Sequence, residues 1–436
     1  MTQQKSPSKI GLFTSTSLVV GNMIASGVFL LPASLAAYGG IGLLGWIGSS
    51  AGAIALALLF SKLSKRIPNA LGGPYAYTRA GLGDFASYLV AWGYWISIWC
   101  TNAAIAVAFV SYLTVFFNVL KTNSLLALGT GLSAIWLLTW VNTRGVKEVG
   151  WVQKITTVLK ITPLLLVTIM GLFYIDFDNF IPFNISSVSN FSAVTATATL
   201  TLFAFLGLES ATIPAGNIHE PEKTIPRATM IGTIITIFIY VLSSTVVMGM
   251  IPAAELKNSN APFADAAAII WGDRARYWVA AGAIVSTLGA LNGWILLQGQ
   301  MPMAAARDKL FPLIFKAENN KGVPAVGIII GSVLISVLMM LNFTSGLNNT
   351  FTFLVLMTTL TVLIPYLFSA TSYGIIILQN KFWKRDLISQ LVIAILAFLF
   401  SLWAVLGSGQ ETVYWGFIAI LSGIPFYVWM KRANHE

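Results

Sequence analysis

The sequence has few of the residues from which soluble proteins and metal sites are built. Among 436 residues there is one cysteine, Cys100, and there are two histidines, His219 and His435. A single cysteine excludes an intramolecular disulfide and a cysteine cluster for a metal ion. Charged residues make up only 9% of the chain, against roughly 25% in a soluble domain. The chain therefore cannot cover its apolar surface against water, and we expect neither a metal nor a cofactor.

Apolar residues dominate what is present. They make up 57% of the chain, and the mean hydropathy is +0.80. Nearly uncharged runs of about 20 residues, the length that crosses a bilayer, recur along the whole sequence. These features predict an all-α polytopic membrane protein. The N-terminal MTQQKSPSK lacks the apolar core of a cleavable signal peptide, so we expect the first span to anchor the chain.

Hydropathy and Gly/Pro punctuation divide the chain into twelve expected transmembrane helices. They cover residues 10–36, 41–64, 85–117, 124–142, 150–174, 192–216, 228–252, 277–304, 323–342, 350–379, 387–407 and 412–431. Residues 253–276 lie between two of these spans and contain a short apolar run. We expect them to form an external helical hairpin or lid.

The distribution of positive charge predicts the orientation. With a cytoplasmic N-terminus, nineteen Lys and Arg residues fall inside, and only Lys121, Lys257, Arg274 and Arg276 fall outside. Loop cations resist translocation, so this bias predicts that both termini are cytoplasmic. The net charge of +10 then reflects membrane topology, and it does not indicate nucleic-acid binding.

Two of the expected spans are interrupted at mid-membrane. The first reads GNMIASGVFLLP, with Asn22, Ser26 and Gly27 at its centre, and the sixth reads TLFAFLGLESATIP, with Gly207 and Glu209. Interrupted segments five spans apart indicate an inverted-repeat transporter whose site lies at the breaks. An alternative is that the small residues only allow close helix packing.

The breaks have a chemical use. Unwinding at Ser26 and Gly27 exposes backbone N–H groups at the start of a half-helix, which can bind a carboxylate. The carbonyls of Met23, Phe203 and Leu206, left unpaired, can accept from an ammonium. An α-amino acid carries both groups on one carbon, whereas a pure diamine uses only the second half of this arrangement.

Two ionisable residues lie within expected spans. Glu209 is the only acid placed well inside the membrane, where a charge costs at least about 2.5 kcal/mol. We interpret it as a coupling site for protons, and the alternative is a hydrogen-bonded carboxyl that holds the broken helix to its neighbours. Lys160 in the fifth span is the matching cation, and the alternative there is a lysine that snorkels to the interface.

Other classes of protein have little support. The chain has no GxxxxGK[ST] motif for ATP hydrolysis, and its spans offer no histidine–carboxylate constellation for an enzyme. Most aromatics will lie at the interfaces or in packing. Tyr94, Phe203 and Trp294 are the rings that we expect to cover a midplane site.

Several stretches together resemble one family across essentially the whole chain. They are GNMIASGVFLLPA, the P-x-x-x-GGPYAYTRAGLG element at 68–83, TLFAFLGLESA, HEPEKTIPRA at 219–228, and LGALNGW. They are similar to the amino acid–polyamine–organocation (APC) superfamily, above all to its basic amino acid/polyamine antiporters. The resemblance implies the LeuT-like fold, with five-helix repeats at 10–174 and 192–379. Two additional helices at 387–431 and cytoplasmic tails at 1–9 and 432–436 complete it.

The resemblance also implies roles for individual residues. Ser26 and Gly27 would bind the substrate carboxylate, and the carbonyls of Met23, Phe203 and Leu206 would bind the α-ammonium. The remaining substrate-binding positions would be Asn22, Ala25, Ser97, Ile98, Asn102, Ile105, Trp294 and Leu356. Gating would fall to Tyr75, Tyr94, Phe203, Glu209 and Trp294, and coupling to Glu209 and Lys160.

The sequence departs from the arginine exchanger in the distal pocket. Phe203 stands where that family member has a stacking tryptophan, and Ala25-Ser26-Gly27 replaces Gly-Ser-Gly. Ile98, Ile105 and Leu356 are apolar where a guanidinium would need polar partners. These departures favour a neutral or mixed amino acid over a strictly basic one. Lys160 resembles the fifth-span lysine of other APC permeases, which argues against sodium coupling.

We therefore expect a secondary amino acid transporter in the bacterial inner membrane that works by alternating access, as an exchanger or with a proton. The first alternative is a strict basic amino acid/polyamine antiporter, such as an arginine/agmatine or ornithine/putrescine exchanger. The second is a membrane sensor that binds an amino acid without moving it. Expected partners are a small-molecule substrate, membrane lipid and, as in the family, a second copy in a homodimer.

Overall fold

A computed structural model describes residues 11–24, 26–67, 73–145, 161–209, 218–379 and 384–433. Within these ranges, ten helices are long and apolar enough to cross a membrane. Two shorter apolar helices, Ile161–Tyr174 and Asn190–Phe205, lie at the positions of the fifth and sixth expected spans. The structure is thus that of the predicted all-helical polytopic membrane protein, while the count of twelve spans stays a prediction.

The first expected span is divided into two helices, α1 and α2, and the helices up to the sixth expected span follow them. They are α1 (Leu12–Met23), α2 (Gly27–Ala36), α3 (Gly42–Arg66), α4 (Pro74–Leu113), α5 (Val119–Thr122), α6 (Ser124–Thr143) and α8 (Asn190–Leu202), which continues as η4 (Phe203–Phe205). Short 3-10 turns are η1 (Gly39–Ile41), η2 (Leu172–Tyr174) and η3 (Phe177–Phe180).

The helices of the second half of the chain follow from residue 221 onward. They are α9 (Pro221–Met250), α10 (Ala253–Leu256), α11 (Pro262–Trp271), α12 (Ala275–Arg307), η7 (Leu313–Lys316), α13 (Ala325–Asn342), η8 (Phe343–Ser345), α14 (Leu347–Gln379), α15 (Lys384–Leu406), α16 (Gln410–Leu421) and α17 (Gly423–Ala433). The expected hairpin at 253–276 forms α10 and α11, and α11 has only ten residues. That length is too short to cross a bilayer.

Two expected boundaries were wrong. The third span was predicted at 85–117, but α4 begins at Pro74 and changes direction at Gly83, whose φ is 79°. The seventh begins earlier than predicted, at Pro221, because proline at the first helical position loses no hydrogen bond. The twelfth, predicted at 412–431, agrees with the apolar stretch Gln410–Arg432, within which α16 ends at Leu421 and α17 begins at Gly423.

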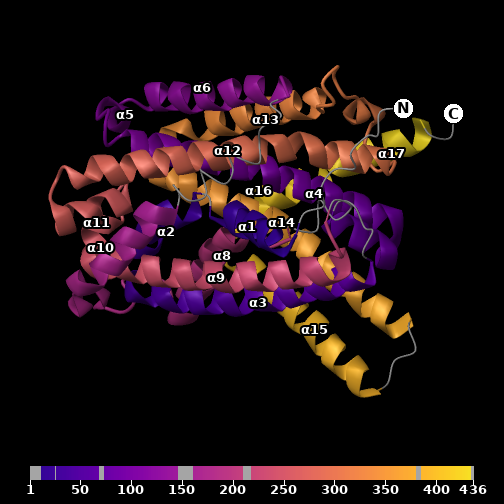
Figure 1. The fold of residues 1–436 in the computed structure, drawn as a ribbon, viewed down its shortest axis with the longest axis horizontal. Coiled ribbons are helices and arrows are strands. Elements are labelled where there is room, and N and C mark those ends of the chain that lie inside the picture. Colours follow the sequence, from indigo (N-terminus) through magenta and orange to yellow (C-terminus); the bar gives the residue numbers. More distant parts are fainter. Residues whose placement is uncertain are drawn as a thin grey trace.

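The helices form two groups around a central region (Figure 1). Helices α4, α6, α12 and α13 lie together on one side, α3 and α9 lie on the other, and α1, α2, α8 and α14 fill the space between. Close packing joins α14 to α4, α4 to α12, α3 to α9, and α1 to α9. Both breaks in the chain therefore lie at the centre of the molecule.

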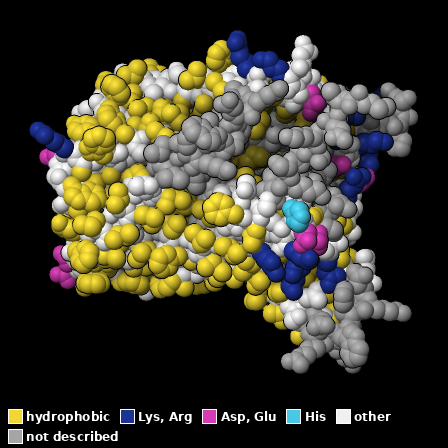
Figure 2. All heavy atoms as spheres, viewed as in Figure 1, with side chains coloured by type: hydrophobic (Ala, Val, Ile, Leu, Met, Phe, Trp, Pro, Cys, Tyr) yellow, Lys and Arg dark blue, Asp and Glu magenta, His cyan; other side chains and the backbone are white. Residues whose placement is uncertain are grey.

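The surface matches a membrane setting. Large apolar side chains are exposed along the body, including Leu137, Phe238 and Leu399. Figure 2 shows hydrophobic atoms over most of one face, with charged side chains gathered at the ends and most of them at the end where α17 lies. An apolar band this extensive is suited to lipid contact.

Candidate binding site

The first helix is broken at mid-length. Helix α1 ends at Met23, Ile24 has φ −76° and ψ 80°, and α2 begins at Gly27. The N–H groups of Gly27 and Val28, the first two of α2, have no partner within the helix, whereas that of Phe29 donates to the Ser26 carbonyl at 3.2 Å. Ser26 is buried, and its Oγ has no hydrogen-bond partner in the part of the chain that the structure describes. Ala25 lies outside the described residues.

The second break begins after η4. Leu206 is extended, with φ −66° and ψ 139°, and Gly207 has a φ of 96°, a conformation that only glycine adopts readily. The two breaks are in contact. A Cβ built on Gly207 would lie 3.4 Å from the Cβ of Asn22, and one built on Gly27 would lie 3.2 Å from the Phe203 ring. Ser210 lies outside the described residues.

Two of the carbonyls at the breaks accept hydrogen bonds from the protein itself. The Met23 carbonyl accepts from the hydroxyl of Tyr240 on α9, and the Phe203 carbonyl accepts from the Leu206 N–H at 3.2 Å. The expectation that both were unpaired was therefore wrong. Each oxygen has a second lone pair for another donor, so each can still accept from an ammonium.

Glu209 follows the second break and is fully enclosed by donors. Its Oε1 accepts from Tyr94 of α4 at 2.7 Å, and its Oε2 accepts from Tyr366 of α14 at 2.9 Å. The backbone N–H groups of Gly207 and Glu209 also donate to the carboxylate. The side chain therefore joins the broken segment to α4 and α14. Tyr366 was not among the site residues that the sequence predicted.

One face of α4 carries four of the expected site residues. Tyr94, Ile98, Asn102 and Ile105 follow one another at helical spacing, and all four are buried. Ser97 is buried as well, but its Oγ donates to the Tyr94 carbonyl at 2.7 Å. The hydroxyl of Ser97 is thus used within its own helix.

Two more helices bring polar atoms that lack partners. The Oδ1 of Asn102, the Nε1 of Trp294 on α12 and the Oγ1 of Thr358 on α14 are all buried without a hydrogen bond in the described part of the chain. Leu356, two residues before Thr358, is half-buried. Buried polar groups are normally paired. Ser26, Asn102 and Trp294 are all expected site residues, and their unpaired atoms are available to a polar ligand.

Comparison with known proteins identifies the chain. The sequence profile of the amino acid permease family matches residues 10–427. The chain belongs to this family. It is also 33% identical to the cadaverine/lysine antiporter of Escherichia coli K12, over 99% of this chain and 96% of that protein.

Two further relatives are similar over comparable lengths. The arginine/ornithine antiporter of Pseudomonas aeruginosa is 32% identical over 99% of this chain and 92% of its own length. The putrescine transporter of Haemophilus influenzae is 30% identical, over 96% of each. The permease is therefore a secondary transporter of the APC superfamily with exchangers among its relatives, as the sequence predicted.

The permease has a second tyrosine–carboxylate pair away from the breaks. Tyr75, an expected gate residue near the start of α4, donates to Asp308 Oδ2 at 2.9 Å, just beyond the end of α12. This contact joins two helix ends at the side of the molecule where Arg307 and Glu318 form an ion pair. Lys160, the expected coupling cation, lies outside the described residues.

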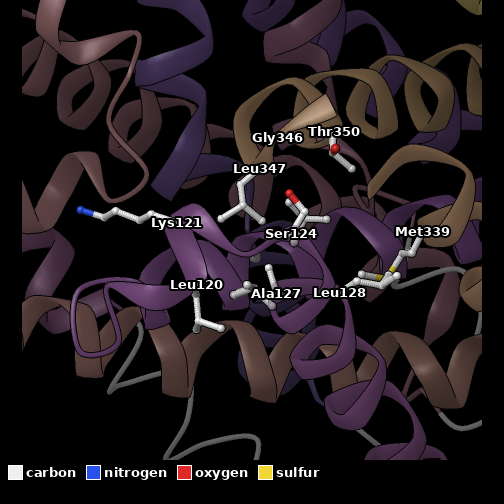
Figure 3. Close-up of a pocket in the computed structure, with 11 residues that line it drawn as sticks. Leu120, Lys121, Ser124, Ala127, Leu128, Met339, Gly346, Leu347 and Thr350 are labelled. Atoms are coloured by element: carbon white, nitrogen blue, oxygen red, sulfur yellow. The ribbon is translucent and has the colours of Figure 1, made fainter. Parts of the chain in front are cut away.

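A cavity of about 50 Å³ lies apart from the breaks (Figure 3). It lies among α4, α5, α6, α13 and α14, and Lys121, Met339 and Thr350 are among its lining residues. The lining includes none of the expected site residues. In the described ranges, no group of three His, Cys, Asp or Glu side chains could hold a metal ion.

Proposed function

We propose that this permease exchanges α-amino acids across the bacterial inner membrane by alternating access, without converting them chemically. The observation that carries the proposal is the contact between the two breaks, where Asn22 meets Gly207 and Gly27 meets Phe203. The first break offers the N–H groups at the start of α2 and the Met23 carbonyl, and the second offers the carbonyls of Phe203 and Leu206. An α-amino acid carries a carboxylate and an ammonium on one carbon, so it can engage both kinds of group.

The proposed pose follows from the two half-helices. The substrate carboxylate binds at the start of α2, against the backbone of Gly27 and the unpaired Ser26 hydroxyl, where the helix dipole favours an anion. The α-ammonium donates to the carbonyls of Leu206 and Phe203 and to the second lone pair of Met23. Asn22 supports the break, and the side chain of the substrate extends toward α4.

The substrate class is supported by the relatives. Their names give cadaverine, lysine, arginine, ornithine and putrescine as substrates. Exchange of a basic amino acid, against another or against a diamine, is thus the first candidate. The second candidate is a neutral or mixed amino acid, which buried Ile98 and Ile105 and half-buried Leu356 favour because they line the distal end with apolar groups.

Gating is assigned to residues on each side of the substrate. Phe203 packs edge-on against Phe351, with ring centroids 6.2 Å apart, and with Trp294 it would cover the site. The Tyr94–Glu209–Tyr366 cluster and the Tyr75–Asp308 bond would close the path to one side. Glu209 and Lys160 would set the charge balance of the cycle.

The proposed setting is a bilayer, with both termini in the cytoplasm. The accumulation of Lys and Arg at the end where α17 lies supports this orientation (Figure 2), because cytoplasmic loops retain cations. The exposed apolar band would contact lipid. A homodimer and the division into repeats at 10–174 and 192–379 remain proposals from the family resemblance.

Reconstitution tests the proposal. Purified protein in proteoliposomes is offered radiolabelled lysine, ornithine, arginine, leucine, cadaverine and putrescine, with and without unlabelled substrate inside. We expect uptake that depends on the internal substrate. Absence of uptake for the whole panel would overturn the transporter proposal, and saturable binding without uptake would support the sensor instead.

A further inference from the structure

A chain of buried hydrogen bonds runs from the candidate site into the outer helices. Asn102 Nδ2 on α4 donates to Gln298 Oε1 on α12 at 2.7 Å. Gln298 Nε2 donates to the Ile328 carbonyl at 2.8 Å and to Ser332 Oγ at 2.9 Å, both on α13. Ser332 Oγ lies 2.6 Å from Thr139 Oγ1 on α6. The chain thus joins four helices, and all four of its side chains are buried.

The Ile328 carbonyl determines which way the Gln298 amide faces. A backbone carbonyl can only accept, so the NH₂ group of Gln298 must point toward α13 and its Oε1 toward α4. The Ile328 carbonyl also accepts from Ser332 Oγ at 2.9 Å, so the reversed amide would set two acceptors against each other and leave the Gln298 Oε1 without a donor in a dry environment. This orientation follows from the hydrogen-bond network, which is the proper basis for assigning an amide.

Gln298 in turn determines the orientation of Asn102. Because Oε1 of Gln298 needs a donor, Asn102 presents its Nδ2 to α12. Its Oδ1 must then face another direction, and this atom has no partner among the described residues. Asn102 lies on the same face of α4 as Tyr94, which contacts Glu209 directly after the second break.

The backbone of α13 at Gly331 lies close against the Gln298 amide. A Cβ on Gly331 of α13 would lie 2.8 Å from Gln298 Cδ and 3.0 Å from its Nε2. The glycine therefore allows α13 to approach Gln298 closely enough for the bonds to Ile328 and Ser332. A larger residue at 331 would have to displace the amide.

We propose that Gln298 is a positioning residue that holds the Asn102 Oδ1 toward the substrate as a fixed hydrogen-bond acceptor. The permease then selects amino acids whose side chain ends in a donor, such as an ammonium, a guanidinium or an amide NH₂, over those that end in a methyl group. This inference rests on the proposed function, because it names the substrate class of the same site.

Lysine and norleucine are the matched probes, since they have the same chain length and differ in the terminal group. In proteoliposomes, wild-type protein should show a KM for lysine well below that for norleucine. Gln298→Met keeps the volume and removes the acceptor, so Asn102 can turn. We expect the lysine KM to rise about tenfold, the effect of one lost charge-assisted bond, with the norleucine KM unchanged.

Two serines of α13 provide a matched control. The Ser332 hydroxyl accepts from Gln298 Nε2, whereas the Ser336 hydroxyl, one turn along, accepts from Trp136 Nε1 of α6 at 3.1 Å and donates to the Ser332 backbone carbonyl, with no bond to Gln298. Ser332→Ala should raise the ratio of lysine KM to norleucine KM, and Ser336→Ala should leave it unchanged. We expect the same ratio of lysine KM to norleucine KM in Asn102→Leu and in the double variant Asn102→Leu/Gln298→Met, because Gln298 acts through Asn102.

The outcomes separate the two proposals. If wild-type vesicles exchange neither probe nor any other amino acid, the proposed function fails. If wild-type vesicles exchange both probes, the proposed function is supported. If Gln298→Met then elutes as the wild type does and keeps the wild-type ratio of lysine KM to norleucine KM, the positioning role of Gln298 is wrong. Where Gln298→Met does not fold, Ser332→Ala decides: a changed ratio supports the role and an unchanged ratio overturns it.

Discussion

The hydroxyl of Tyr240 on α9 donates to the backbone carbonyl of Met23, the last residue of α1. The ring of Tyr240 also packs against Trp46 of α3 and Phe205 of η4. One side chain therefore contacts both interrupted segments and the helix beside them. A half-helix that ends inside a membrane protein leaves carbonyls without intrahelical partners, and Tyr240 supplies a donor for one of them.

Tyr240→Phe should weaken substrate binding as well as stability. The ring contacts remain, but the Met23 carbonyl loses its donor, at a net cost of about 1 kcal/mol, and the break is held less firmly. We expect a lower melting temperature and a higher KM for the exchanged amino acid. Tyr88→Phe is the control, because Tyr88 donates to the Gly423 carbonyl at 2.7 Å, away from the breaks. Equal KM changes in both variants would contradict a specific role for Tyr240.

Ser26→Ala should separate binding from folding. The Ser26 hydroxyl is buried and unpaired in the described part of the chain, so its removal costs no hydrogen bond of the protein itself. We expect unchanged or slightly higher thermal stability, with substrate affinity reduced about tenfold by loss of one bond to a carboxylate. Calorimetric titration and thermal unfolding in detergent measure the two effects.

The control for this change is Ser50→Ala on α3, another buried hydroxyl without a partner in the described ranges. Its loss should leave substrate affinity at the wild-type value. If Ser26→Ala binds substrate as tightly as Ser50→Ala does, the carboxylate is held elsewhere and the proposed pose is wrong.

Much of the fold could be predicted because membrane helices obey a simple rule. Long apolar runs and the asymmetry of Lys and Arg locate spans without knowledge of their neighbours. The prediction was wrong at the start of α4, which begins at Pro74 and not at residue 85 and carries Arg79 and Asp84 in the additional stretch. In the structure these two side chains form an ion pair at 2.8 Å on an exposed stretch of helix that hydropathy alone does not reveal.

The candidate site was only half predictable. The breaks are visible in sequence because Ser26, Gly27 and Gly207 are poor residues for the middle of a membrane helix. Tyr240, Gln298 and Tyr366 were missed, because each acts through a partner more than 150 residues away. Such pairings depend on how helices register against one another, and no local pattern encodes that.

Gly207→Ala tests whether the second break needs its backbone conformation. Gly207 has a φ of 96°, and a residue with a side chain loses about 1–2 kcal/mol in the left-handed region. We expect reduced stability and a raised KM, since the Leu206 carbonyl would move. In α12, a Cβ on Gly293 would meet nothing within 4 Å. Gly293→Ala should therefore raise the free energy of unfolding by up to about 1 kcal/mol. A Gly207 variant as stable as the Gly293 variant would refute the strain argument.

Glu209 variants should distinguish proton coupling from a purely structural carboxylate. Both oxygens accept tyrosine hydroxyls, at 2.7 and 2.9 Å. Glu209→Leu leaves two buried hydroxyls unpaired, at about 1–3 kcal/mol each, and should impair folding. Glu209→Gln keeps an acceptor and nearly the same shape but cannot take up a proton. We therefore expect it to retain exchange at equal pH and to lose any stimulation by a pH gradient.

Proteoliposome uptake with and without an imposed pH gradient measures this difference. Asp84→Asn provides the control, since Asp84 forms its ion pair with Arg79 on the exposed surface and the same chemical change there should leave both rates unaltered. If Glu209→Gln responds to the gradient as wild type does, Glu209 does not carry the coupled proton. Its two tyrosine contacts would then serve to hold the broken segment between α4 and α14.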